Sequence, residues 1–313
     1  MKKVLLSIMA GVLAFGITGA AVSAAPAKQV EVLLNTVKMK FPDAKPFQDG
    51  QGSVMVPIRF VSEALGAKVT YSKVGKVSKV GIVSKDHKVD MTIGQTTALV
   101  NGQKKDYGTQ IILKQNRTFV PLRLVSEGLG QKVEWDKIGR WVWIGNKDFR
   151  NTDDKQFKLT KLSDFKAYTA KSELDFKNMK GEKYSGVKII KESDLPIQLG
   201  NGQVIYDINM TKNEIIGNVV QIRSSQRGNS ITFLVKDSYG RGRGVVDTLF
   251  SNNEDKTGMN YYPLISTSDK FQGGKYLENY EGWKSFKVNQ ADYILLRDGE
   301  LDNYAVAIVN PFK

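Results

Sequence analysis

Residues 56–75 read VPIRFVSEALGAKVTYSKVG, and residues 120–139 read VPLRLVSEGLGQKVEWDKIG. Twelve of these twenty positions are identical at a constant offset of 64 residues. Average composition would give about one or two identities by chance. The first half of the chain is therefore predicted to contain an internal repeat.

Each copy has the pattern of a short helix. Pro57 suits a first helical turn, where no amide partner is lost. Ile58, Val61 and Leu65 lie three and four residues apart, so they share one face. Gly66 stands where helices often end in the left-handed conformation. The corresponding residues of the second copy are Pro121, Leu122, Val125, Leu129 and Gly130.

Alternating apolar residues after each helix predict a half-buried strand, with Val69 and Tyr71 in the first copy and Val133 and Trp135 in the second. Trp141 and Trp143 continue the pattern of the second copy. Further short strands are predicted at 30–34, 37–41, 88–93 and 97–100, the last followed by the hairpin signal Asn101-Gly102. We therefore expect residues 28–147 to form one α+β domain, with two strand–helix–strand units over a mainly antiparallel sheet.

Two pairs of opposite charges recur in the repeat, Arg59 with Glu63 and Arg123 with Glu127. Each pair is spaced i, i+4, so the two charges can meet on a helix surface. One interpretation is a paired binding site for anions or carboxylates. The other is a partly buried ion pair that fixes each helix on its sheet. Repetition favours the structural interpretation, because a scaffold constraint applies to both copies.

The pattern VPxRxVSExLGxKVxWD, preceded by a strand pair with Asn-Gly, resembles the copper amine oxidase N-terminal-like domain, also called a stalk domain. The resemblance covers about residues 28–147 and not the C-terminal half. The first copy departs from it at Tyr71-Ser72, where the second has Trp135-Asp136. It implies an appended, non-catalytic domain of mixed α/β structure, common in secreted proteins of Gram-positive bacteria. It does not imply amine oxidase activity.

Copper amine oxidases are expected to need three His ligands and a Tyr-derived quinone. This chain has one His, His87, at a predicted turn where a solvated side chain is expected. One imidazole cannot supply such a copper site. The stretch from Tyr276 to Glu281 resembles the quinone motif except at its first position, and we interpret that match as chance. No cofactor or metal is expected.

The N-terminus has the secretory order of basic, apolar and small residues, with Lys2 and Lys3, an apolar run over 4–21, and Val22-Ser23-Ala24. Residues 1–24 are therefore predicted to be a signal peptide cleaved after Ala24. No second stretch approaches the about 20 apolar residues that span a bilayer. The chain has no Cys, so disulfides and thiolate sites are excluded.

The whole chain carries a net charge of +14, of which +12 remains after Lys2 and Lys3 are removed. Such a balance favours anionic surroundings, including wall polymers. No nucleic-acid motif accompanies the charge, so dedicated nucleic-acid binding is not expected. We expect a secreted or extracellular protein, held at a cell wall by non-covalent contacts if it stays there.

The second half has a different pattern. Residues 148–186 are polar and Lys-rich, which indicates a linker that partly docks on a neighbour. Residues 187–313 are predicted to form a mostly β domain, sandwich or barrel-like. The candidate strands are 187–191, 203–210, 215–223, 230–236, 244–250, 261–266, 283–288, 292–297 and 304–309. Weak alternation in the last of these predicts a central strand covered on both faces.

Chemical motifs are sparse in this half. Gly240-Arg241-Gly242-Arg243-Gly244 can be a phosphate-approaching loop or a flexible hairpin tip, and the missing helix signal favours the tip. The aromatic-rich stretch with Tyr261, Tyr262, Tyr276, Tyr280 and Trp283 can stack on sugars or belong to a β core, and the core is favoured.

The leading functional hypothesis is a secreted, non-enzymatic envelope protein that binds an anionic wall polymer, a matrix component or a surface protein. One alternative is a secreted polysaccharide hydrolase that uses Asp or Glu residues of the C-terminal domain. Another is a structural spacer within a surface assembly. Two carboxylates facing each other across an aromatic-lined groove would favour the hydrolase.

Overall fold

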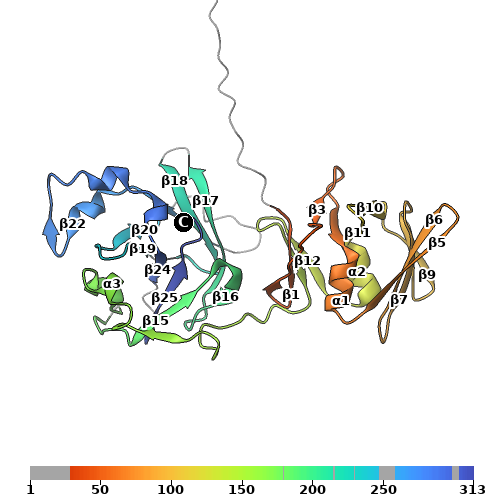
Figure 1. Ribbon diagram of the computed structural model, residues 1–313, viewed down its shortest axis with the longest axis horizontal. Helices are drawn as coiled ribbons and strands as arrows, with labels where there is room; N and C mark the ends of the chain where they lie inside the picture. Colours follow the sequence, from red (N-terminus) through yellow and green to blue (C-terminus); the bar gives the residue numbers. More distant parts are fainter. Residues whose placement is uncertain (1–28, 179, 214–215, 229, 247–257, 298–302) are drawn as a thin grey trace, which may run out of the picture.

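The chain forms two units that lie side by side, one from the N-terminal and one from the C-terminal half (Figure 1). The computed structural model describes residues 29–178, 180–213, 216–228, 230–246, 258–297 and 303–313. The predicted signal peptide with its cleavage site at Ala24 lies outside these residues. No helix in the described part of the chain is long and apolar enough to cross a membrane.

Three small sheets build the N-terminal domain around two short helices. The helices are α1 (Ile58–Ala64) and α2 (Leu122–Leu129). One four-stranded sheet has the order β12 (Val133–Asp136), β13 (Trp141–Ile144), β1 (Glu31–Leu34), β2 (Val37–Lys38). The second has the order β10 (Ile112–Lys114), β11 (Arg117–Pro121), β4 (Val54–Pro57), β3 (Phe47–Gln48). A five-stranded antiparallel sheet runs in sequence order through β5 (Lys68–Val74), β6 (Val77–Val83), β7 (Lys88–Thr92), β8 (Thr97–Val100) and β9 (Gln103–Asp106).

A single apolar core joins these sheets and both helices. Val61 and Val125 of the helices are 1% and 0% exposed, and they share a cluster with Val56 of β4, Val80 of β6 and Val142 of β13. Helices of seven and eight residues are too short to be stable alone in water. They are held by this packing, and the predicted α+β class is confirmed.

The ends of the helices follow the sequence pattern with one difference. Gly66 and Gly130 adopt φ values of 75° and 62°, the left-handed conformation predicted for them. Pro57 and Pro121 are the last residues of β4 and β11, which pair with each other in an antiparallel ladder. The prolines therefore precede the helices and do not form their first turn. Fixed proline φ suits the switch from strand to helix equally well.

The strands that follow the two helices enter different sheets. β5 is an edge strand of the five-stranded sheet, whereas β12 lies at the edge of the β12-β13-β1-β2 sheet. Trp141 and Trp143 belong to β13, which is parallel to β1 and antiparallel to β12. The two repeat copies therefore share a helix and its flanks but differ in what surrounds them.

The two C-cap glycines give a matched pair for mutation. A Cβ at Gly66 meets nothing within 4 Å, whereas one at Gly130 would lie 2.3 Å from Nε2 of His87. Gly66→Ala should cost about 1 kcal/mol, the strain of a left-handed alanine. Gly130→Ala should cost about 1–3 kcal/mol more, because the His87 ring must move. Denaturant unfolding measures both changes.

A His87→Ala background supplies the control for this comparison. In that background the cost of Gly130→Ala should fall to that of Gly66→Ala, since the clash is gone. Equal costs in the native background would show that the His87 ring moves freely. The packing of His87 on α2 would then be refuted.

The C-terminal domain is a sandwich of two sheets. A mixed six-stranded sheet has the order β14 (Leu159–Lys161), β15 (Gly186–Ile190), β25 (Tyr304–Val309), β24 (Tyr293–Arg297), β19 (Ser230–Leu234), β20 (Arg241–Gly244). The other is antiparallel with the order β16 (Ile197–Gln198), β17 (Val204–Asn213), β18 (Gly217–Ser224), β21 (Gly258–Pro263). A small hairpin pairs β22 (Phe271–Gln272) with β23 (Lys275–Tyr276). Short helical segments are α3 (Lys166–Thr169), η1 (Glu173–Phe176), η2 (Glu192–Asp194), η3 (Thr267–Lys270), η4 (Gly282–Ser285) and η5 (Val288–Gln290).

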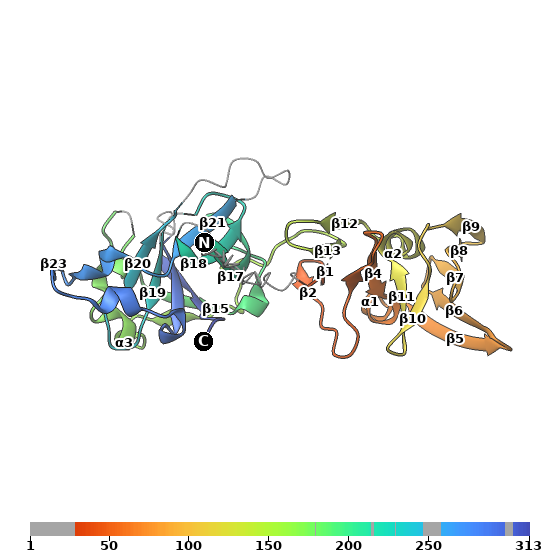
Figure 2. The same cartoon turned by 90° about the horizontal axis from the view of Figure 1, so that it is seen from above.

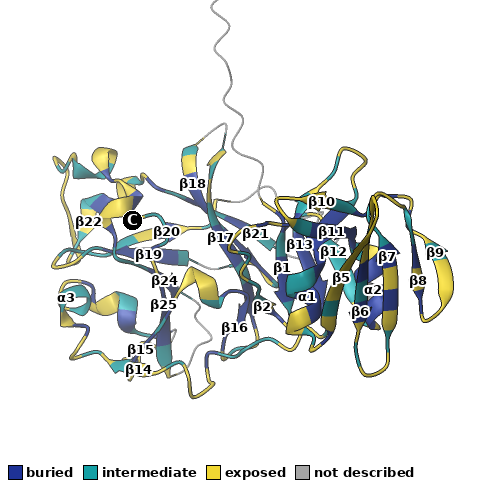
Figure 3. Ribbon diagram, turned by 45° about the vertical axis from the view of Figure 1, so that its right-hand side comes forward, coloured by how far each residue is buried: buried dark blue, intermediate teal, exposed yellow. Residues whose placement is uncertain are grey.

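The six-stranded sheet is covered on both faces. Val306 and Ile308 of β25 pack with Ile222 of β18 between the two sheets. Ala305 and Ala307 pack on the opposite face with aromatic residues of the segment before β15. β25 lies between β15 and β24, and its central residues are buried (Figure 3). The prediction of a central strand at 304–309 is confirmed.

Three predictions for this half are wrong. The supposed linker 148–186 contributes β14 to the six-stranded sheet and buries Phe165 and Phe176 beneath it, so most of it belongs to the domain. The supposed strand 283–288 is the helical segment η4 and the residues after it. Residues 241–244 form β20 instead of a flexible tip. Most of the predicted strand 244–250 lies outside the described residues.

A charged and aromatic contact joins the two domains. Trp141 and Trp143 pack with Leu33 of the N-terminal domain and with Tyr206 of β17. An ion pair crosses the same junction, with Nη1 of Arg223 2.5 Å from Oδ2 of Asp136. Both charged side chains are 10% exposed or less. The backbone amide of Gly139 donates to Oδ1 of the same aspartate, so the carboxylate also fixes the β12–β13 turn.

Candidate functional site

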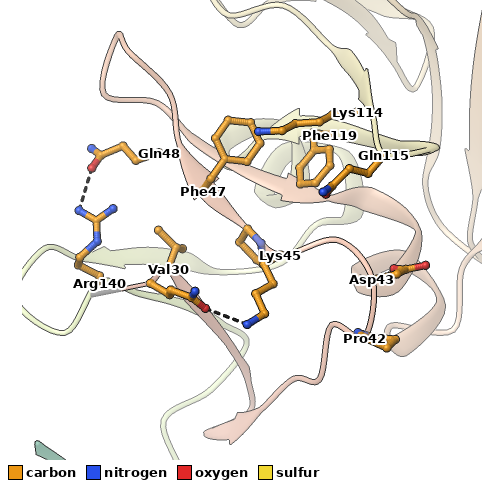
Figure 4. Close-up of a pocket in the computed structure, with 12 residues that line it drawn as sticks. Val30, Pro42, Asp43, Lys45, Phe47, Gln48, Lys114, Gln115, Phe119 and Arg140 are labelled. Atoms are coloured by element: carbon orange, nitrogen blue, oxygen red, sulfur yellow. Dashed lines mark hydrogen bonds between the residues drawn. The ribbon is translucent and has the colours of Figure 1, made fainter. Parts of the chain in front are cut away.

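A groove of about 530 Å³ runs across the N-terminal domain, between the β3 end of one four-stranded sheet and the chain entering β1 (Figure 4). We call it the cationic groove. It is lined by Gln29, Val30, Pro42, Asp43, Lys45, Pro46, Phe47, Gln48, Lys114, Gln115, Phe119 and Arg140. These residues come from four separate stretches of the chain.

Aromatic packing forms the floor at one end. The rings of Phe47 and Phe119 meet edge to face at 5.2 Å between centroids, and Phe119 is 1% exposed. Nζ of Lys114 lies 4.2 Å from the centroid of Phe47 (Figure 4). Gln115 and Asn116, both at positive φ, form the tight β10–β11 turn that places Lys114 there.

Lys45 and Arg140 stand on the other side, each bonded to an amide oxygen. Nζ of Lys45 donates to Oε1 of Gln29 at 3.0 Å, and Nη1 of Arg140 donates to Oε1 of Gln48 at 3.1 Å (Figure 4). Arg140 itself has a φ of 55°, and its buried Nε has no hydrogen-bond partner. Its guanidinium lies 5.9 Å from the Trp135 ring centroid.

The groove is positively charged because its cations face amides and rings instead of carboxylates. Its one carboxylate, Asp43, is already paired with Arg117 of β11. Lys45, Lys114 and Arg140 take part in no ion pair within the described part of the chain. Because no carboxylate neutralises their charge, these cations can attract an anion from outside the protein.

The charge of the whole chain is concentrated in the same domain. Residues 28–147 contain 20 Lys and Arg against 10 Asp and Glu, a net charge of +10. Residues 187–313 contain 15 of each, a net charge of zero. The N-terminal domain therefore carries ten of the twelve net charges that follow residue 24.

The charge pairs of the repeat do not come together as a site. Arg59 bonds Glu63 at 3.1 Å, as the i, i+4 spacing predicts, and both side chains are about half exposed. In the second copy Glu127 instead pairs with Lys105 at 3.0 Å. Burial and the nearby Glu127 raise the pKa of Tyr107 to about 12, which keeps its hydroxyl a donor. These contacts tie β9 to α2 and leave the carboxylate occupied.

Copper chemistry finds no support in the residues present. His87 is half-buried beside Gly130, with Asn101 3.5 Å from its Nδ1, so its ring is less solvated than expected. The Tyr280 hydroxyl accepts a hydrogen bond from Arg241 at 3.2 Å. Among the described residues no three His, Cys, Asp or Glu side chains are grouped as metal ligands. A copper centre does not fit this set of donors.

A second pocket, of about 360 Å³, lies at the domain junction and contains aromatic rings and two carboxylates. Glu134 and Asp136 both come from β12, and Asp136 is engaged by Arg223. Hydrogen bonds from Lys132 and Lys147 lower the pKa of Glu134 to about 2. A glycosidase acid needs a raised pKa, so this pair does not favour hydrolysis.

The aromatic stretch of the C-terminal domain divides between core and surface. Tyr262 is 2% exposed and packs between the two sheets, which agrees with a core role. Tyr276 of β23 is 58% exposed and lies beside Phe271, with Nζ of Lys270 5.8 Å from its ring centroid. These aromatic residues therefore do not line one common surface.

Comparison with known proteins addresses the N-terminal domain. The sequence model of a family described as the copper amine oxidase N-terminal domain matches residues 33–144. No curated protein and no solved structure matches the chain. The match spans both repeat copies and ten of the twelve residues that line the groove, with the C-terminal sandwich outside it. Residues 33–144 therefore form a copper amine oxidase N-terminal-like domain.

Proposed function

We propose that this is a secreted, non-enzymatic binding protein whose cationic groove holds an anionic cell-wall polymer. The observation that carries the proposal is the set of three cations, Lys45, Lys114 and Arg140, that line one groove without carboxylate partners. The proposal includes export, with cleavage after Ala24, and non-covalent retention at the wall. The predicted signal peptide supports export.

The groove chemistry fits a polymer with repeated phosphate or carboxylate groups. Lys45 and Lys114 supply compact ammonium charges, and Arg140 supplies a planar donor fork suited to an oxyanion. Gln29, Gln48 and Gln115 add amide groups that can bond hydroxyls of the polymer backbone. Phe47 gives an apolar wall against which a sugar or glycerol unit can pack. Because the site is an open groove, a polymer longer than the groove can lie across it and extend beyond both ends.

The test is sedimentation with isolated Gram-positive walls, with and without their teichoic acids, using the protein from Ala25 to Lys313. The native protein should sediment with intact walls at low salt and be released by salt. The triple variant Lys45→Gln, Lys114→Gln, Arg140→Gln should lose most of this binding. Walls stripped of teichoic acid should bind the native protein weakly.

A control with equal loss of charge separates the groove from net charge. Lys212, Lys236 and Lys287 are exposed residues of the C-terminal domain, and their replacement by glutamine removes the same three charges. This control should bind walls almost as the native protein does. Equal loss in both triple variants would refute the groove as the binding site. Unchanged binding in both would refute the electrostatic proposal altogether.

A further inference from the structure

The hairpin formed by β5 and β6 reaches further than its counterpart in the second copy. Each of its strands has seven residues, whereas β12 and β13 have four each. Three extra residues per strand add about 10 Å of length. The hairpin forms the end of the N-terminal domain that lies farthest from the C-terminal domain (Figures 1 and 2). Gly75, at a φ of 59°, closes it in a two-residue turn.

Apolar side chains at the tip are exposed. Val74 and Val77 pair across the turn, and they are 68% and 45% exposed. At the offset of 64 their counterparts are Ile138, which is half-buried, and Trp141, which is 0% exposed at the domain junction. The second copy therefore covers these two positions, and the first copy leaves them open.

Three lysines lie close to the two valines in the hairpin. Lys73, Lys76 and Lys79 are all exposed, and residues 64–85 contain no Asp or Glu. None of the three lysines forms an ion pair within the described part of the chain. Tyr71 stands behind them, 48% exposed, with the Arg59 guanidinium 5.6 Å from its ring centroid. The tip thus combines two exposed valines, three lysines without carboxylate partners and an amphipathic tyrosine.

We infer that this hairpin tip docks end-on onto an anionic lipid bilayer. The valines enter the boundary between headgroups and acyl chains, while the lysines contact anionic headgroups and Tyr71 lies at the interface level. Two valines are too small an area for a specific protein partner, whose interface buries about 800 Å² per side. A bilayer needs no shape complementarity. A soluble polyanion would attract the lysines but would give the exposed valines nothing to enter.

The proposal is independent of the cationic groove, because none of the groove residues belongs to β5 or β6. The probe is a vesicle of phosphatidylglycerol and phosphatidylcholine, with pure phosphatidylcholine as the comparison. The protein from Ala25 to Lys313 is used, so that the apolar run 4–21 does not contribute. The native protein should bind the anionic vesicles and not the neutral ones.

Two variants test the two parts of the tip. Lys73→Gln with Lys76→Gln should weaken binding about 25-fold, at about fivefold per lysine near an anionic surface. Val74→Ser with Val77→Ser should weaken it at least about tenfold. Leu174, which is 72% exposed in the C-terminal domain, supplies the control, and Leu174→Ser should leave vesicle binding unchanged.

Insertion has its own readout. The emission of a Val77→Trp variant should shift to shorter wavelength when anionic vesicles are added. A lysine-sensitive but valine-insensitive interaction without that shift would identify a simple polyanion contact and overturn the proposal. The triple groove variant should bind vesicles normally. A native protein that binds anionic vesicles but not isolated walls would thus refute only the groove.

Discussion

Replacing Asp269 by asparagine should destabilise the C-terminal domain by about 3–5 kcal/mol, the cost of leaving a buried charge without its partner. Its carboxylate is 1% exposed and accepts hydrogen bonds from Nη1 of Arg243 at 2.6 Å and from Arg241 at 2.7 Å. The Arg243 side chain is 0% exposed. Urea unfolding of the native protein and the variant measures the change.

Two further variants separate this cost from a general effect of charge removal. Glu281 forms an exposed pair with Lys284, and Glu281→Gln should leave the unfolding free energy nearly unchanged. The double variant Asp269→Leu, Arg243→Met should be more stable than Asp269→Asn, because it removes the fully buried charge of Arg243 and leaves only the partly exposed Arg241 without its partner. An Asp269→Asn protein as stable as the native one would contradict the structural role given to this pair.

Replacing Asp136 by asparagine should loosen the junction between the two domains at a cost of about 3 kcal/mol. The remaining Oδ1 can still accept from the amides of Ile138 and Gly139, so the β12–β13 turn is kept. The new side-chain NH2 group, however, is a hydrogen-bond donor and lies against the guanidinium of Arg223, which also carries only donors and is nearly buried. The variant should unfold in two separate calorimetric steps, and its radius of gyration by X-ray scattering should increase.

The neighbouring Glu134 supplies the control for the junction. Its partners Lys132 and Lys147 are about half exposed or more, so Glu134→Gln should cost less than about 1 kcal/mol. It should leave the scattering curve unchanged. If Asp136→Asn and Glu134→Gln behave alike, the buried ion pair does not hold the domains together.

The local elements were predictable because their signals are local. Apolar spacing located both short helices, and Gly66 and Gly130 marked their ends. Arg241 and Arg243 were misread because Asp269, the carboxylate that pairs with both side chains, lies 26 or more residues away. The segment with Phe165 and Phe176 was likewise misread as a linker. Its sequence is mostly polar, and the two rings become core residues only by packing on the six-stranded sheet, whose strands lie far away in the sequence.

The cationic groove could not have been predicted from the sequence. Gln29, Lys45, Lys114 and Arg140 span more than one hundred residues, and lysines are spread evenly along the chain. These cations are distinguished by having no carboxylate close to them, and that depends on the fold and cannot be read from the sequence. The one available signal was regional, because the net charge is concentrated in residues 28–147.

The most direct test of groove binding is the salt dependence of affinity for a soluble glycerol phosphate polymer, measured by calorimetry at several salt concentrations. The native protein should lose affinity steeply with salt, as expected when bound cations release counterions from a polyanion. The triple variant of Lys45, Lys114 and Arg140 should bind more weakly and with a shallower slope, while the control triple of Lys212, Lys236 and Lys287 should keep the native slope. Identical slopes for the groove variant and the native protein would contradict the proposed site.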